Sequence, residues 1–444
     1  MNGDIKIMGV LGAGRSAGYL IEYLGKYCQN TGRTLRVYDV QFERLQASFQ
    51  VCDAVELHVA ELSQGEVMDA IVSGLDLVVS VLPPTMHLAV AEACLRHKCH
   101  LFTASYTSPQ MLALGEEAAK QGLMFMNELG LDPGIDHLSA SRLFDHAKAL
   151  ELEIQTFESH CGGLVALEDC AENPWQYKFT WNPTNVVLAG QGGDCLWKEG
   201  GVEQRLDGME IFAHAKTMTV PGLGDFDVYP NRNSLTYEGL YGLQNAQTLL
   251  RGTLRRKGYC SAWNLLVQHG FTDAKIAGAW STVKDWFVSH AGFEHSADWV
   301  DRLKENEAMA KLVPYVQFLR LEEGVDGLDP STMTSAQILE AILLDRWRLD
   351  AGDKDEVVMV HKLGLRDSLG QSKQWYSVLQ VLGEGGDRTA MAKTVGLPLA
   401  MGVETFLEGE AQGLGAVVPF DKSWYLPILH KLEIQGIAFK EYLT

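Results

Sequence analysis

Residues 5–132 alternate between short apolar runs and segments whose apolar residues recur every three or four positions. The apolar runs have the length of strands and cover residues 5–11, 35–39, 55–60, 75–82, 99–104 and 123–129. The segments between them, such as 17–29, 86–97 and 108–121, have the spacing of amphipathic helices. Strands that alternate with such helices form a parallel, doubly wound sheet. The sequence therefore predicts an α/β Rossmann domain over residues 1–132.

A glycine-rich loop separates the first predicted strand from the first predicted helix, and its residues are Gly12, Ala13, Gly14, Arg15 and Ser16. Gly12 permits a tight turn, and Gly14 lets backbone N–H groups approach a pyrophosphate at the helix N-terminus. Two spaced glycines often mark only a turn. Here the strand, loop and helix follow in order and further strands come after them, so we expect this loop to bind a dinucleotide cofactor.

Asp39 ends the second predicted strand, where a carboxylate in such domains accepts hydrogen bonds from the adenosine ribose. The same carboxylate repels the 2′-phosphate of NADP. We therefore expect NAD to be the cofactor, with NADP as the alternative. The competing interpretation is that Asp39 is an ordinary solvated acid at a strand end.

The acidic composition excludes several classes of partner. The net charge is −20, and such a surface repels nucleic acid and anionic lipid.

No apolar run reaches the roughly 18 residues of a membrane span. The first residues show no basic leader, so we expect a cytoplasmic protein. The eight cysteines have no zinc-type spacing, so we expect thiols and no metal site.

The pattern changes after about residue 151. Strand-like runs at 153–160, 222–229, 356–362 and 377–383 flank a stretch, 240–350, that has mainly helical spacing. We expect a mixed-sheet α+β domain from 133–240 and 351–388, interrupted by a helical domain at 241–350. Residues 389–407 form a predicted helix, and segment 389–411 should complete the Rossmann domain. A last strand at 417–420 and a helix at 424–442 are expected within 412–444.

Ligands of such sheets bind beyond the carboxyl ends of the strands, at Pro83–His87, Thr103–Pro109 and Glu128–His137. Distinctive sequences stand there and downstream: Thr103-Ala104-Ser105-Tyr106, Glu128-Leu129-Gly130-Leu131-Asp132-Pro133-Gly134, His160-Cys161-Gly162-Gly163, Tyr229-Pro230-Asn231-Arg232-Asn233 and Leu250-Arg251-Gly252-Thr253-Leu254-Arg255. In these motifs, and in their order along nearly the whole chain, the sequence resembles the saccharopine reductases, the glutamate-forming saccharopine dehydrogenases.

The resemblance implies an enzyme of lysine metabolism. It would interconvert saccharopine with glutamate and 2-aminoadipate 6-semialdehyde through an imine, with hydride transfer to or from NAD(P). The substrate contacts that it implies are Ser105, Tyr106, Asp132, Arg232, Arg251, Gly252, Thr253 and Leu254. Beside the glycine loop and Asp39, the implied cofactor contacts are Leu82, Pro83, Ala104, Ser105, Leu131, Asp132, Pro133 and Thr180. The chain departs from the family pattern at Asp39, Pro84 and Asn233.

The chemistry of the residues agrees with that reaction. Saccharopine carries three carboxylates, and guanidinium groups bind carboxylates through two parallel hydrogen bonds, which suits Arg232 and Arg251. A carboxylate near the imine stabilises its protonated form, so Asp132 is an expected catalytic residue. Tyr106, one of the contacts that the resemblance implies, is the other. Each arginine could instead pair with an acidic neighbour, and Asp132 could cap the helix after Pro133.

Weaker candidates and other functions stay open at this point. His137 and His160 could shuttle protons or be structural, and Lys178 could bind a carboxylate or be solvated. The alternative functions are a carboxynorspermidine dehydrogenase-like imine reductase and a non-catalytic NAD-binding protein of the same family. For either enzyme the substrate is a small molecule, and a homodimer is one possible assembly. Because the first predicted strand begins at Ile5, we expect no fused lysine–ketoglutarate reductase domain.

Overall fold

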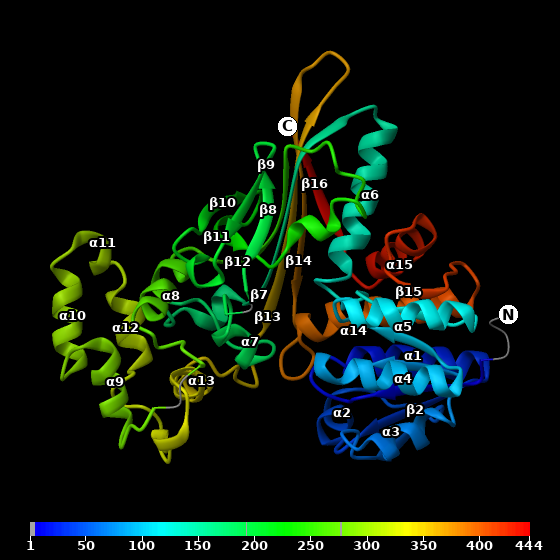
Figure 1. The fold of residues 1–444 in the computed structure, drawn as a ribbon, viewed down its shortest axis with the longest axis horizontal. Helices are drawn as coiled ribbons and strands as arrows, with labels where there is room; N and C mark the ends of the chain where they lie inside the picture. The colour runs from blue at the N-terminus through cyan, green and yellow to red at the C-terminus, as the bar shows by residue number, and fades with distance from the viewer. Residues whose placement is uncertain (1–4, 192, 276–277) are drawn as a thin grey trace. The chain divides into compact units, whose positions relative to one another are not determined.

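The computed structural model describes residues 5–191, 193–275 and 278–444. The chain divides into two compact units. The first consists of Met1–Glu153 with Leu379–Phe439, and the second of Ile154–Val378 with Lys440–Thr444. Figure 1 labels the helices of both units and most of their strands.

The sheet of the first unit has seven strands in the order β15-β6-β5-β4-β1-β2-β3, and every neighbouring pair is parallel. The six strands expected from the sequence are present as β1 (Ile7–Leu11), β2 (Thr34–Asp39), β3 (Val55–Val59), β4 (Leu77–Ser80), β5 (His100–Thr103) and β6 (Met124–Met126). The seventh, β15 (Gly415–Val417), comes from the C-terminal segment. The predicted Rossmann fold is confirmed.

Helices alternate with these strands: α1 (Gly18–Thr31), α2 (Glu43–Ser48), α3 (Gly65–Val72), α4 (His87–His97), α5 (Pro109–Lys120) and α6 (Ile135–Ala149). Two more come from the C-terminal segment, α14 (Ala390–Leu407) and α15 (Lys422–Ile434). The expected start of α14 is confirmed, because Thr389 Oγ1 accepts a hydrogen bond from Ala392 N at 2.9 Å. A Cβ at Gly396 would lie only 3.0 Å from Leu20 N, so glycine permits α14 to pack closely on α1.

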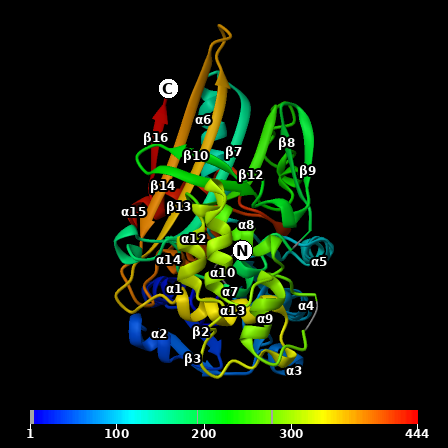
Figure 2. The ribbon, with the colours of Figure 1, turned by 90° about the vertical axis from the view of Figure 1, so that its left-hand side faces the viewer.

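The sheet of the second unit is mixed, as predicted, and runs in the order β10-β11-β12-β7-β13-β14-β16, with β8 and β9 attached to β12 (Figure 2). Strand β12 is parallel to β7 and antiparallel to β11. The bounds are β7 (Glu153–Val165), β8 (Cys195–Glu199), β9 (Val202–Leu206), β10 (Lys216–Val220), β11 (Gly224–Pro230), β12 (Thr248–Arg256), β13 (Asp355–Arg366), β14 (Ser372–Leu382) and β16 (Phe439–Leu443).

The structure differs from the expected secondary structure at two places. The stretch 240–350 was expected to be mainly helical, yet its first part is β12 in the interior of the sheet. The strand was missed because Arg251, Arg255 and Arg256 are buried, so its inward positions do not show as apolar residues. The expected helix 424–442 ends at Ile434, because Gly436 adopts a φ of +80° and the chain turns into β16.

The rest of that stretch is helical: α8 (Tyr259–Gln268), α9 (Val283–Ala291), α10 (Ser296–Lys304), α11 (Glu307–Ala310), α12 (Val313–Leu319) and α13 (Ser335–Arg346). Trp263 and Trp286 are fully buried there. They share one hydrophobic core with Trp175 and with Val187 of the short helix α7 (Pro183–Val187). A separate helical domain at 241–350 therefore stays a prediction. Among the described residues no helix meets the length and hydropathy of a membrane span.

Candidate functional site

The glycine loop has the geometry of a phosphate cradle. Gly12 has a φ of +102°, and a Cβ there would lie 3.3 Å from Val81 O and 3.4 Å from Leu82 Cδ2. No heavy atom lies within 4 Å of a Cβ built at Gly14, so space remains above the loop. The backbone N–H groups that begin α1 face such a loop in dinucleotide-binding domains. These residues therefore fit a bound pyrophosphate.

Asp39 lies beside this loop at the end of β2. Its Oδ2 accepts a hydrogen bond from Ala13 N at 2.5 Å, and its Oδ1 accepts one from Gln41 N at 3.2 Å. The carboxylate is partly exposed, so it is still accessible to a ligand. Arg44, further along after β2, forms an ion pair with Asp387 at 3.3 Å. The position of Asp39 suits a contact with the adenosine ribose.

Tyr106 and Asp132 lie together in the first unit. The Tyr106 hydroxyl donates a hydrogen bond to Asp132 Oδ1 at 2.9 Å, and both side chains are half-buried. The residue at the N-cap of α6 is Gly134, whose N–H donates to Asp136 Oδ1 at 2.6 Å. The alternative role of Asp132 as the helix cap is therefore not what the structure shows, and its carboxylate is paired with a tyrosine hydroxyl.

The loops after β5 and β6 support this pair. Glu128, at a φ of +56°, is buried and lies 3.0 Å from His137 Nε2 through its Oε2, and its Oε1 accepts from Thr107 N at 2.9 Å. Burial disfavours the charged carboxylate, but the hydrogen bonds of His137 and Thr107 outweigh it and lower the pKa of Glu128. His137 is fully buried against Glu128, which favours the structural interpretation of this histidine.

A second buried histidine, His87, contacts Ser105. It ends the predicted ligand-binding stretch Pro83–His87, but no role was predicted for its side chain. His87 Nε2 is 2.8 Å from Ser105 Oγ and 3.3 Å from Thr103 Oγ1, and its Nδ1 is 3.0 Å from Ser80 Oγ. Burial lowers the pKa of His87 to about 4, so its ring is neutral at physiological pH. The ring fixes the Ser105 hydroxyl at the end of β5. A histidine in the first turn of α4 gave no signal of this contact in the sequence.

The remaining substrate candidates lie in the second unit. Arg251 is 5% exposed, its guanidinium lies 4.4 Å from the centre of the Tyr237 ring, and its backbone N donates to Ser234 Oγ at 2.9 Å. Arg232 is exposed and adopts a φ of +57°. Thr253 is half-buried, whereas the Leu254 side chain belongs to a hydrophobic core. Leu254 can therefore contact a ligand only through its backbone.

Gly252 is required by packing. A Cβ there would lie 2.4 Å from Nδ1 of the buried His160 and 2.6 Å from Tyr229 O. The His160 Nε2 lies 3.5 Å from Glu158 Oε2, and neither ring nitrogen has a hydrogen-bond partner among the described residues, so the buried ring has no space to move away from an added Cβ.

We therefore expect Gly252→Ala to destabilise the protein by about 1–3 kcal/mol, the usual cost of overpacking. Urea unfolding measures this loss. Gly239→Ala is the matched control, because a Cβ there meets no atom within 4 Å. Equal stability of the two variants would contradict the packing argument.

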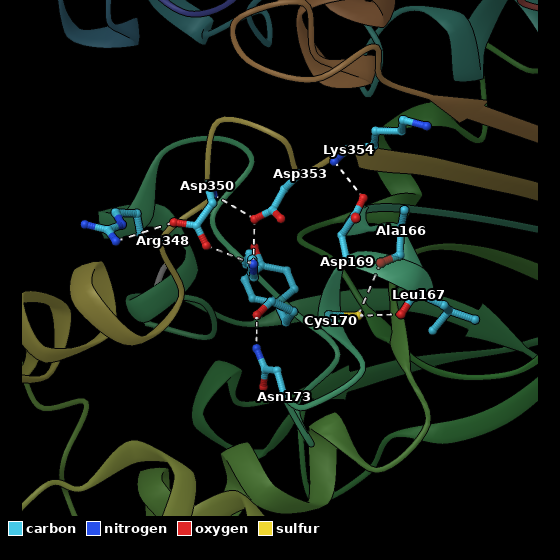
Figure 3. A network of polar contacts seen from close by, with 11 residues as sticks. Ala166, Leu167, Asp169, Cys170, Asn173, Arg348, Asp350, Asp353 and Lys354 are labelled. Carbon is cyan, nitrogen blue, oxygen red and sulfur yellow. Dashed lines mark hydrogen bonds and ion pairs between the residues drawn. The ribbon is translucent and has the colours of Figure 1, made fainter.

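The ammonium group of Lys178 forms ion pairs with two neighbouring carboxylates. Its Nζ lies 2.5 Å from Asp353 Oδ2 and 3.6 Å from Asp350 Oδ2, and Asp353 also accepts from Asp350 N at 2.7 Å. Figure 3 shows Asp350 and Asp353 in this network. Lys178 therefore ties the segment before Thr180 to the start of β13. The Thr180 side chain is buried, and its Oγ1 has no hydrogen-bond partner among the described residues. An unsatisfied buried hydroxyl fits a contact with a ligand.

Comparisons with known proteins cover both halves of the chain. Residues 8–126 match the family model "Saccharopine dehydrogenase NADP binding domain", and residues 130–437 match "Saccharopine dehydrogenase C-terminal domain". The chain is 34% identical over 415 residues to the mitochondrial alpha-aminoadipic semialdehyde synthase of Bos taurus. That match covers 91% of this chain but only 44% of the bovine protein, so the chain spans less than half of that relative.

Two yeast matches extend over nearly complete proteins. Saccharopine dehydrogenase [NADP(+), L-glutamate-forming] of Saccharomyces cerevisiae is 32% identical over 400 residues, which are 86% of this chain and 87% of the yeast protein. The solved structure of the apo, histidine-tagged L-Glu-forming enzyme from the same yeast superposes with a TM-score of 0.86 at 27% identity. It covers 99% of this chain and 100% of the yeast chain.

Proposed function

Because the chain belongs to the saccharopine dehydrogenase family, we propose that it interconverts saccharopine with L-glutamate and 2-aminoadipate 6-semialdehyde. A bound nicotinamide dinucleotide would accept hydride in the direction of saccharopine oxidation and supply it in reverse. The observation that carries this proposal is the Tyr106–Asp132 pair, which places a carboxylate and a hydroxyl at strand exits of the Rossmann sheet.

The roles of the residues follow from their chemistry. In the oxidative direction, hydride would leave the lysine-derived methylene carbon next to the bridging nitrogen, and a protonated imine would form at that carbon. Water would then add to this carbon and release glutamate and 2-aminoadipate 6-semialdehyde. The Asp132 carboxylate stabilises the positive charge of that imine, and the Tyr106 hydroxyl orients the carboxylate. Ser105, held by His87, donates to the substrate. Arg232 and Arg251 bind carboxylates of saccharopine, and the backbone of 252–254 contacts it.

The cofactor contacts are proposed on the same basis. Gly12, Gly14 and the start of α1 hold the pyrophosphate, and Asp39 holds the adenosine ribose. Leu82 adjoins the loop, and Ala104 lies against Gly130, where an added Cβ would come within 2.9 Å of Ala104 Cβ. The contacts proposed toward the nicotinamide half are Pro83, Leu131, Pro133 and Thr180.

We predict that NAD is preferred over NADP because of Asp39, although the yeast relative is named for NADP(+). The test compares kcat/KM for the two cofactors at fixed saccharopine. Asp39→Ala should reduce the discrimination, because it removes both the ribose hydrogen bonds and the repulsion of a 2′-phosphate. A wild-type preference for NADP would contradict the prediction.

A substrate panel tests the proposed function against the alternatives. Initial rates of cofactor reduction are compared for saccharopine and for carboxynorspermidine. We expect saccharopine to be the substrate, because Arg232 and Arg251 would repel the extra positive charge of a polyamine. Cofactor binding without turnover of either compound would favour the non-catalytic alternative. The cytoplasmic location and the homodimer stay predictions, the latter testable by light scattering.

A further inference from the structure

One face of β12 carries Arg251, Thr253 and Arg255, because alternate residues of a strand point to the same side of the sheet. The neighbouring strands place Cys161 of β7 and Tyr229 of β11 in register with Thr253, on that same face. Arg251 and Thr253 are proposed substrate contacts. Arg255 therefore lies on the same face of the sheet as Arg251 and Thr253, two residues beyond Thr253 along the strand.

Arg255 is a buried cation that forms no ion pair within the described part of the chain. Its register partner on β11 is the buried Asp227, whose Oδ2 accepts instead from Gly258 N at 2.9 Å and from Cys260 N at 3.1 Å. The residue is 4% exposed, its Nη1 donates to Leu254 O at 3.2 Å, and its Nε has no acceptor. Among the residues that the structure describes, no carboxylate forms an ion pair with it. Burying a charge without a partner is costly, and such groups are normally paired or bind a ligand.

The aromatic groups around Arg255 do not neutralise it. Its guanidinium lies 5.3 Å from the centre of the Tyr177 ring and 5.5 Å from that of Tyr259. Burial raises the pKa of Tyr229 to about 12 and also raises the pKa values of Tyr177 and Tyr259, so all three phenols stay neutral at physiological pH. Ring faces attract a cation, but they add no negative charge.

The same core holds further donors that lack acceptors. Trp263 Nε1 and Trp347 Nε1 are buried without a hydrogen-bond partner among the described residues. The Trp347 ring lies 5.1 Å from that of Tyr177, and the Trp263 ring lies 5.8 Å from that of Tyr259, which are the two rings that contact Arg255. The next arginine of the strand shows the contrast, because Arg256 pairs with Glu356.

We propose that Arg255 is the cation of an anion-binding site whose ligand is a carboxylate. The identity of that ligand rests on the proposed function: saccharopine has three carboxylates, and Arg232 and Arg251 provide for two of them. Arg255 provides the third charge-assisted contact, on the face of β12 that carries Arg251. The same chemistry would accept an inorganic anion such as chloride, and the experiment separates the two sources.

The experiment uses Arg255→Met in the full chain, with Arg255→Lys as a second variant that keeps the charge. Thermal unfolding is followed in isethionate buffer, with saccharopine, glutamate or sodium chloride added at constant ionic strength. We expect saccharopine to raise the Tm of the wild-type protein and chloride to leave it unchanged. In Arg255→Met, the Kd for saccharopine should rise at least ~10-fold, the effect of losing a charge-assisted hydrogen bond.

The Tm of ligand-free Arg255→Met separates a binding role of Arg255 from a purely structural one. Replacing an uncompensated buried charge by an apolar side chain should leave that Tm equal or higher. Arg256→Met is the matched control and should lower the Tm, because it leaves Glu356 buried without its partner. A saturable effect of chloride on the wild-type protein that Arg255→Met abolishes would support the site and assign it to an inorganic anion.

A lower ligand-free Tm in Arg255→Met, with unchanged affinity for saccharopine, glutamate and chloride, would overturn the proposal. Failure of the proposed function gives a different result. The wild-type protein would then not oxidise saccharopine, while any binding of glutamate or chloride would still depend on Arg255.

Discussion

Asp132→Asn is expected to lower kcat/KM for saccharopine by at least ~100-fold, the scale of removing one preorganised electrostatic partner. The substitution keeps the size of the side chain and an oxygen that can accept from the Tyr106 hydroxyl. It removes only the negative charge that stabilises the protonated imine. Because Gly134 is the N-cap of α6, the Tm should change little. Steady-state kinetics and thermal unfolding measure the two effects.

Asp145→Asn is the control for this prediction. Asp145 lies on α6 in the same unit and also accepts a hydrogen bond from a tyrosine hydroxyl, that of Tyr425. The same chemical change is thus made in a second Tyr–Asp pair, which has no proposed role in the reaction. We expect near-normal turnover of Asp145→Asn. Near-normal turnover of a folded Asp132→Asn protein would remove Asp132 from the mechanism.

Removing the guanidinium of Arg251 or Arg232 is expected to weaken the binding of saccharopine without weakening the binding of the cofactor. Losing a charge-assisted hydrogen bond to a buried carboxylate costs about 1.5–3 kcal/mol, or roughly 10- to 150-fold in kcat/KM. Arg251→Gln should have the larger effect, because Arg251 is 5% exposed and Arg232 is on the surface. Arg251→Lys should recover only part of the loss, because an ammonium group lacks the planar pair of donors.

The Kd for the cofactor separates a substrate role from a structural one in these variants. It should stay close to the wild-type value, because both arginines belong to the second unit and the glycine loop to the first. Arg205→Gln is the charge control, since the Arg205 side chain in the second unit is 75% exposed and pairs with Asp194. Equal losses of cofactor and substrate affinity, or a loss of folded protein, would contradict the proposed role.

The Rossmann domain could be predicted because its strands are buried on both faces and therefore appear as continuous apolar runs. The glycine loop and Asp39 follow from this, since their positions at strand ends define their surroundings. Strand β12 could not be predicted in the same way. It places Arg251, Arg255 and Arg256 in the interior, and a pattern of apolar residues does not reveal a strand whose buried positions are charged.

The supporting residues of the site could not be predicted for a related reason. The sequence identified Glu128 only as part of a motif. Its contact with His137 depends on a backbone φ of +56°, which the amino-acid types at and around Glu128 do not predict. His87 and Ser105 are 18 positions apart and meet only because β4 and β5 are neighbours in the sheet. Such contacts arise from topology, whereas Tyr106 and Asp132 were identified by resemblance to the family.

The proposed reaction is the oxidation of saccharopine to glutamate and 2-aminoadipate 6-semialdehyde with a nicotinamide cofactor. The most direct measurement incubates the purified wild-type protein with saccharopine and NAD, and separately with NADP, and quantifies the reduced cofactor and the free glutamate. We expect reduced cofactor and glutamate to appear in equal amounts, and neither to appear without saccharopine. Cofactor reduction without glutamate, or no reduction with either cofactor, would contradict the proposed reaction.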